Sequence, residues 1–294
     1  MGMGMLPLLH TASGPYQFHW ALHPDVILLC FVLMVGYVYM VTQLRGMVSD
    51  AGRVRRSQVA LFGAGVFAIW AVAGTPVHDL SEQYLLSFHM FQHSTFALIA
   101  APLLLGGIPV WAWQALFRVR GVLPMARVLT HPIVAFSIFN AIMLLTHLPP
   151  AVDLSLRHHW FHFAVHAALL STAMLMWWPV LSNVPELPHL SAPLQMAYLF
   201  LQSLLPMVLS SFITFAEGAV YTFYEQAPRT WGLTAQEDQQ IGGGVMKLMG
   251  SLIIWGLITW VFFKWYAREE AAAADPLWDE VAEELEAMGL TPRQ

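Results

Sequence analysis

Long apolar runs constrain the fold of this chain more than any other feature. Seven runs each have enough residues to cross the ~30 Å hydrocarbon core of a bilayer as a helix that rises ~1.5 Å per residue. The chain is 57% hydrophobic and only 11% charged, unlike a soluble domain. The sequence therefore predicts an all-α, polytopic membrane protein, a bundle of seven transmembrane helices. The expected spans are residues 24–44, 57–74, 83–107, 132–148, 160–181, 193–215 and 243–265.

The distribution of Lys and Arg predicts the orientation of the bundle. Cations gather between spans one and two, between spans three and four, and after span seven, whereas residues 75–82 contain none. Because cytoplasmic loops carry an excess of Lys and Arg, we expect the N-terminus outside and the C-terminus inside. The predicted domains are an extracytoplasmic segment (1–23), the membrane domain (24–265) and a cytoplasmic, acidic, amphipathic tail (266–294).

The tail has a helical pattern of its own. Asp275 followed by Pro276 is typical of a helix start, and apolar residues then recur at helical spacing between acidic ones.

The net charge of −5 comes mostly from this segment. Since the chain has no basic stripe, we expect no nucleic acid partner.

Two pairs of histidines lie inside the apolar runs. His89 and His93 are four residues apart in the third run, and His162 and His166 repeat this spacing in the fifth. On a helix, residues four apart share one face, so both imidazoles of a pair can reach a single ion. Both spans run inward from the outside, and residue counting places the pairs ~3 to ~15 Å below their outer ends. We predict a metal site of these four residues if the two helices pack side by side.

Further metal ligands are expected around this site. With the predicted topology, 11 of the 13 histidines lie outside or in the outer halves of spans, and only His131 and His189 are cytoplasmic. The site would then face the periplasm or the cell exterior. His10, His19 and His23 belong to the N-terminal tail, where we expect solvent exposure. The predicted accessory residues are His78, Asp79, His147, His158 and His159.

Residue type restricts the metal only loosely. Neutral imidazole binds copper, zinc, iron and nickel, and the 16 methionines favour a soft ion such as Cu(I). Met90 directly follows His89 and points about 100° away from it on a helix, so we give it no primary ligand role. The single cysteine, Cys30, excludes a site built from several thiolates of this chain. Copper is the expected metal, with zinc as an alternative.

Several motifs together resemble one known family. His78-Asp79, the segment YLLSFHMFQH at 84–93, and Ala101-Pro102 resemble the signature of the CtaG-like family of cytochrome c oxidase assembly factors. The resemblance covers roughly residues 20–265. It extends through His147-Leu-Pro149, His162-xxx-His166, Trp177-Trp178-Pro179, Tyr221-xx-Tyr224 and Asp238-Gln239-xx-Gly242-Gly243.

The resemblance implies a role in the bacterial plasma (inner) membrane. A family member would help assemble a haem–copper oxidase, by handling copper for its catalytic subunit. The implied partners are that catalytic subunit and an extracytoplasmic copper donor, within the lipid bilayer, and a homo-oligomer is compatible with them. We expect a transfer protein and not an enzyme, because an incomplete shell of neutral imidazoles can both hold and release an ion.

The chain departs from the family pattern at two places. Lys247 stands where the family tends to place an aromatic residue, and we expect its ammonium to pair with Asp238 or Glu237.

The second departure concerns the histidine pair of the fifth run. Phe161 and Val165 precede its two histidines, whereas an acidic residue often precedes the second histidine in the family. We expect Asp79 or Asp153 to supply the missing carboxylate.

Two other classes of protein compete with this prediction. In a haem-binding electron-transfer protein, histidines of spans three and five would ligate the haem iron on opposite faces. A copper or proton transporter would need a polar path into the inner half of the membrane, and the third span has almost no polar residue below His93 except Ser94 and Thr95.

Overall fold

A computed structural model of the chain describes residues 16–17, 20–49 and 51–288. This part of the chain is helical and contains no strand. Among the described residues, six helical segments are long and apolar enough to cross a membrane: Pro24–Met47, Arg56–Ala73, Leu86–Gly107, His159–Leu181, Ala192–Phe215 and Ala235–Ala272. The all-α, polytopic membrane architecture is confirmed. In chain order the elements are α1 (Pro24–Tyr39), η1 (Met40–Leu44), α2 (Arg45–Met47), α3 (Arg56–Ala73), α4 (Pro76–Gln83), α5 (Leu86–Thr95), η2 (Phe96–Ala100), α6 (Ala101–Gly107), α7 (Val110–Phe117), α8 (Val122–Leu129), α9 (Pro132–Thr146), α10 (Pro149–Arg157), α11 (His159–Leu181), α12 (Ala192–Phe215), α13 (Thr222–Gln226) and α14 (Ala235–Ala287).

The predicted fourth span does not form one straight membrane-spanning helix in the structure. Helix α9 has 15 residues, which gives it a length of about 22 Å, shorter than a bilayer core. It counts as a span only together with α8, from which it is bent by 71°. The bend lies at Pro132, since the residue before a proline avoids the helical conformation and His131 has a ψ of 131°. The bundle thus has six spans, or seven if this bent pair is one.

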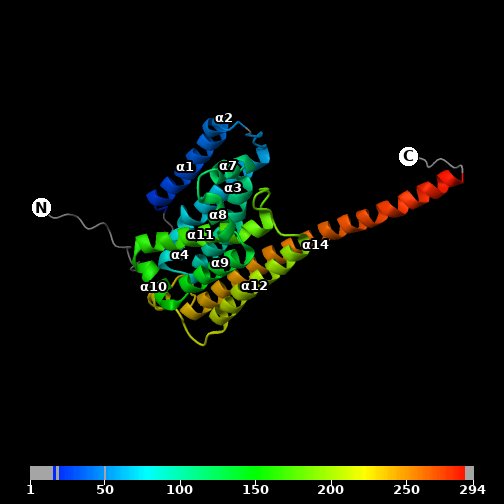
Figure 1. The fold of residues 1–294 in the computed structure, drawn as a ribbon. Helices are drawn as coiled ribbons and strands as arrows, with labels where there is room; N and C mark the ends of the chain where they lie inside the picture. Colours follow the sequence, from blue (N-terminus) through cyan, green and yellow to red (C-terminus); the bar gives the residue numbers. More distant parts are fainter. Residues whose placement is uncertain (1–15, 18–19, 50, 289–294) are drawn as a thin grey trace.

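The third predicted span lies at the centre of the bundle. It is made of α5, the π-helical turn η2 and α6, which contact α3, α11 and α14. Of its most apolar stretch 67% is buried, against 11% for the span that contains α1, which packs on α3 at the edge. Helices α12 and α14 lie side by side, and the end of α14 projects beyond the bundle (Figure 1).

Two segments differ from the sequence-based expectation. Helix α14 continues through Asp275 and Pro276 to Ala287, so the predicted separate helix start in the tail is wrong. Residues 75–82, expected to be an outer loop, instead form α4, which begins at Pro76 after Thr75 accepts a hydrogen bond from the Val77 N–H at 3.3 Å. The α4 residues His78, Asp79, Ser81 and Glu82 are all buried. A charged segment therefore covers this end of the bundle. We call the end that contains α4 and the start of α5 the histidine end.

The opposite end of α11 packs against aromatic side chains. We call the cluster of Trp113, Phe117, Trp177, Trp178 and Leu187 the aromatic end. The rings of Trp113 and Trp178 meet edge to face at 4.8 Å between centroids, and the Trp178 indole donates to the Leu187 carbonyl at 3.1 Å. Trp177 and Trp178 are 2% and 5% exposed. They belong to the protein core and do not lie at a lipid interface, which is where tryptophans at the ends of spans are usually found.

Candidate metal centre

The two predicted histidine pairs meet at the histidine end. Helix α5 carries His89 and His93, and α11 carries His162 and His166. Within the pairs the ring centroids are 4.2 and 4.1 Å apart, and between the pairs 5.0 Å (His93 to His166), 5.7 Å (His89 to His162) and 6.2 Å (His89 to His166). The Nε2 atoms of His93 and His166 share a hydrogen bond at 3.1 Å. The four imidazoles thus lie in one pocket, three of them fully buried and His166 half-buried.

A carboxylate from a distant helix fixes the position of α5. The residue at its start, Leu85, makes no capping hydrogen bond through its side chain. Asp238 of α14 accepts hydrogen bonds from the Leu86 N–H (2.6 Å), the Ser87 N–H (3.2 Å) and the Ser87 hydroxyl (2.5 Å). A carboxylate here satisfies free N–H groups and interacts favourably with the positive end of the helix dipole. Contact with α14 therefore sets the position of α5, and of its histidines, along the axis of the bundle.

This arrangement overturns the expected partner of Lys247. Asp238 is engaged with α5, and Glu237 accepts hydrogen bonds from Thr234 at the start of α14. The Lys247 ammonium lies 5.9 Å from the ring centroid of Phe215, within the range of a cation–π interaction.

Helix geometry changes three residues after His93, where α5 passes into η2 at Phe96. Pro102 has no N–H to donate within the helix, and the five residues before Ala101 form the wider π-helical turn η2. The carbonyl of Ala97 in this turn accepts a hydrogen bond of 2.7 Å from the Trp177 indole. The aromatic end therefore supports the lower part of the helix that carries His89 and His93.

Glu82 of α4 holds two of the histidines. Its Oε1 lies 2.7 Å from His162 Nε2 and 2.9 Å from His78 Nε2, and its side chain is 6% exposed. Burial alone would raise the pKa of the Glu82 carboxyl, but His162 and His78 outweigh burial and hold that pKa well below its usual value. Because a carboxylate only accepts hydrogen bonds, both Nε2 atoms carry the proton in the neutral rings. The lone pair of His162 is then at Nδ1, which is where a metal would bind.

Glu82 was missed at the sequence level. The carboxylate was expected from Asp79 or Asp153, whereas the carboxylate in contact with His162 is that of Glu82. Asp153 accepts from the Phe223 N–H at 3.1 Å and from the Thr222 hydroxyl, and Asp79 lies 3.6 Å from His23 Nε2. The available signal was the spacing of four between His78 and Glu82, which places both on one face of a helix.

A hydrogen-bonded amide holds His78 in place. The Gln92 Nε2 donates to His78 Nδ1 at 3.0 Å and to the Val72 carbonyl at 3.1 Å, while its Oε1 accepts from the Ser81 hydroxyl at 3.0 Å. The hydroxyl of Tyr224 donates to the Ser81 carbonyl. Each buried polar group in this set has a partner, which gives the histidine end a defined shape.

The accessory residues divide into two groups. His78 and His147 adjoin the four imidazoles, with ring centroids 6.3 Å from His162 and 5.2 Å from His93, respectively. Asp79 is buried beside them on α4. His158 and His159 are exposed at the start of α11, where His159 Nε2 lies 3.5 Å from an Asp25 carboxylate oxygen.

The histidines of the N-terminal tail also differ from one another. His23 packs edge to face on His78 at 4.5 Å, so it is part of the histidine end and not a solvated tail residue. His10 and His19 lie outside the described residues.

The nitrogen atoms fit a metal, although the present geometry does not hold one. Among the described residues, no group of three or more His, Cys, Asp or Glu side chains is arranged to coordinate an ion. The hydrogen bond between His93 and His166 occupies nitrogens that coordination would need. Yet the buried atoms His89 Nδ1, His93 Nδ1, His162 Nδ1 and His147 Nε2 have no hydrogen-bond partner in the described part of the chain. An unpaired buried polar atom costs about 1–3 kcal/mol, so four of them together point to a ligand.

A cavity of about 330 Å³ adjoins two of the four imidazoles, His162 and His166. It lies between α1, α3 and α11 and is lined mostly by apolar residues such as Leu33, Phe62 and Leu170. His78, Glu82, His162 and His166 line it as well.

The fold and the site together define the class of protein. It is a helical membrane bundle with a buried group of imidazoles and a carboxylate at one end. The chain belongs to the family of cytochrome c oxidase caa3 assembly factors, Caa3_CtaG, which it matches over residues 35–268. The resemblance predicted from the motifs is therefore confirmed.

Two curated proteins are similar to this chain, and both are uncharacterised. Uncharacterised proteins of Mycobacterium bovis and Mycobacterium tuberculosis are each 25% identical to the chain over 263 residues, which cover 83% of this chain and 39% of the relative. The chain thus spans about two fifths of the length of these relatives. No solved structure matches it.

Proposed function

We propose that this protein assists the assembly of a haem–copper oxidase by holding copper ions at His89, His93, His162 and His166. Copper is a cargo here, taken from an extracytoplasmic donor and passed to the catalytic subunit of the oxidase. Membership of the assembly-factor family supports the role in assembly. The observation that carries the copper proposal is the group of buried, unpaired imidazole nitrogens on two neighbouring helices.

The geometry suggests how such a site would load and unload. Glu82 fixes His162 with Nδ1 unprotonated, so this nitrogen can bind an ion at once. His93 and His166 must first break the hydrogen bond between them and turn toward the ion. Binding is thereby weakened by the lost hydrogen bond, which re-forms on release. That balance suits a protein that transfers its ion, and the proposal gives the protein no catalytic role.

The proposal includes a direction of transfer. The 330 Å³ cavity brings an apolar space up to His162 and His166 from between α1 and α11, and α1 packs mainly on α3. A partner subunit in the same bilayer can approach from this side. With the predicted topology, the donor approaches from the periplasm or the cell exterior.

Geometry disfavours the haem alternative. A haem would have to place its macrocycle between two axial imidazoles. The direct hydrogen bond between His93 and His166 leaves no space between those rings. An optical spectrum of the purified protein with a Soret band would favour haem, and copper uptake into vesicles containing the protein would favour a transporter.

Oxidase copper content in cells provides the test. In a strain that lacks this protein, we expect the oxidase to contain less copper, and the wild-type gene to restore it. The variant His162→Gln/His166→Gln should fail to restore it, because the amide side chains can keep hydrogen bonds to Glu82 and His93 but bind copper poorly. The control is His131→Gln, which changes an exposed histidine outside the candidate site. Full restoration by the double variant would contradict the proposal.

A further inference from the structure

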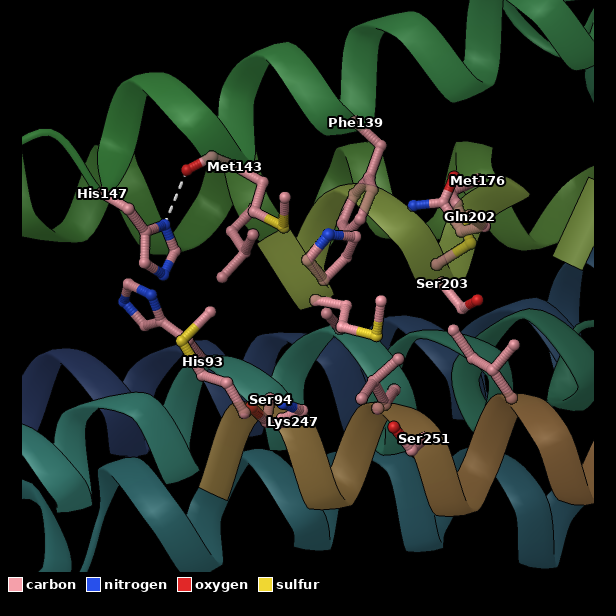
Figure 2. A pocket seen from close by; sticks show the side chains of 18 residues that line it. His93, Ser94, Phe139, Met143, His147, Met176, Gln202, Ser203, Lys247 and Ser251 are labelled. Atoms are coloured by element: carbon pink, nitrogen blue, oxygen red, sulfur yellow. Dashed lines mark hydrogen bonds between the residues drawn. The ribbon is translucent and has the colours of Figure 1, made fainter. Parts of the chain in front are cut away.

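A second, smaller cavity lies deeper in the bundle than the four imidazoles. It has a volume of about 60 Å³, room for an ion or a few water molecules. His93 and His147 face each other at one end of it, and Gln202, Ser203 and Ser251 lie at the other (Figure 2). Its walls come from five different helices, so no single span reveals it in the sequence.

Methionines are the common element of its lining. Met143 of α9, Met176 of α11, Met207 of α12 and Met246 of α14 all line the cavity, and Figure 2 shows the Met143 side chain directed into it. Methionine also fills irregular gaps in cores, so the lining alone does not define a site. Thioether sulfur, however, is a soft ligand that selects Cu(I) among the common metal ions.

The tautomer of His147 provides the second observation. Its Nδ1 lies 2.6 Å from the carbonyl oxygen of Met143, and a carbonyl only accepts, so Nδ1 carries the proton. In the neutral ring the lone pair is then at Nε2. This atom is buried and has no hydrogen-bond partner among the described residues, and His147 is 4% exposed. Within the described residues, the protein thus keeps an unpaired nitrogen lone pair beside a cavity whose lining includes four methionines.

Met143 and His147 share the spacing of the outer histidine pairs. They are four residues apart at the end of α9, so their side chains lie on one face. Met246 approaches from α14 and is buried, as is Met143. Lys247 also lines the cavity. Its ammonium lies over the ring of Phe215, and Phe215 is not part of the lining.

We propose that this cavity is a second copper site, which binds a cuprous ion through His147 Nε2 and the thioether sulfurs of Met143 and Met246. The site rests on the proposed function, because copper is the cargo. His93 belongs to both sites: its Nε2 contacts His166, and its ring lies 5.2 Å from that of His147. An ion can therefore pass between the sites by exchange of ligands at His93, without any change of oxidation state. The inner site retains the reduced ion, which the imidazoles alone do not select.

X-ray absorption on the purified full-length protein tests the inference directly. The protein is loaded with Cu(I) in the absence of oxygen, and the copper equivalents bound are measured by competition with a chromophoric Cu(I) chelator. We expect copper–sulfur scattering in the wild type, and copper–selenium scattering when the methionines are replaced by selenomethionine. The selenium measurement needs no substitution, so it holds even if a variant fails to fold. Scattering from nitrogen ligands alone would overturn the inner site.

Substitutions then separate the two sites. Met143→Leu/Met246→Leu keeps the side-chain volume and should lose one copper equivalent together with the sulfur signal. Met90→Leu is the control, since Met90 is fully buried next to His89 but lines neither cavity. His162→Gln/His166→Gln should lose the other equivalent and keep the sulfur signal. If the leucine variant binds copper like the wild type, the inner site fails and the outer site stands. If the glutamine variant binds copper like the wild type, the outer site fails, whereas a retained sulfur signal still supports the inner site.

Discussion

The two ends of α11 differ in how they bury their side chains. At the aromatic end, Trp178 and Trp113 pack edge to face, and the Trp177 indole finds a carbonyl partner. At the histidine end, several buried imidazole nitrogens have no partner in the part of the chain that the structure describes. The indoles of Trp177 and Trp178 thus have carbonyl partners, whereas the histidine end keeps a group of costly unpaired nitrogens among the described residues. This difference supports the proposal that the aromatic end maintains the fold and that the histidine end binds a ligand.

The largest effect on stability is expected at the aromatic end. Trp177→Ala should lower the free energy of unfolding by about 3–5 kcal/mol, because it empties a buried site and leaves the Ala97 carbonyl without its donor. Thermal unfolding in detergent, followed by circular dichroism, measures this loss. The control Trp160→Ala changes a tryptophan that is 72% exposed at the start of the same helix. Equal stability of the two variants would break the contrast between the ends.

An intermediate effect is expected where α14 supports α5. Asp238→Ala removes the acceptor of three hydrogen bonds and should cost about 1–3 kcal/mol of stability. Copper affinity should fall as well, because the height of His89 and His93 depends on this contact. Glu237→Gln is the matched control, since glutamine can keep the capping hydrogen bonds to Thr234. Calorimetry and copper titration of both variants would show whether fold and site are coupled here, and unchanged copper binding in Asp238→Ala would refute the coupling.

A smaller effect on stability is expected for Glu82→Gln. The amide keeps the shape of the carboxylate but loses its charge, so stability should fall by only about 1 kcal/mol. Copper affinity should fall by about 10–100-fold, because a group that orients a metal-binding imidazole is changed. Competition with a copper chelator measures the affinity. A variant that loses stability but binds copper with unchanged affinity would assign Glu82 to the fold and not to the site.

The sequence predicted those parts of the molecule that depend on one helix. The spacing of His89 with His93, and of His162 with His166, fixes each pair on a face, and the matched depth in two spans allows a shared site. Whether the two helices touch could not be predicted from the sequence. The role of Glu82 escaped prediction because residues 75–82 are charged and were expected to face solvent, whereas α4 folds over the bundle end.

Contacts between helices explain the other misses. Asp238 caps a helix more than 150 positions away along the chain, and the methionine-lined cavity draws its walls from five helices. The third span alone offers almost no polar path below His93, which is why no deeper site was predicted. Residues that converge only through tertiary packing leave no periodic signal in the sequence.

Copper binding by purified His162→Gln/His166→Gln protein tests the central claim most directly. The account predicts that the variant loses the copper bound through nitrogen alone while its helical content and unfolding temperature stay close to those of the wild type. A variant that binds the same copper through the same nitrogen ligands as the wild type would contradict it.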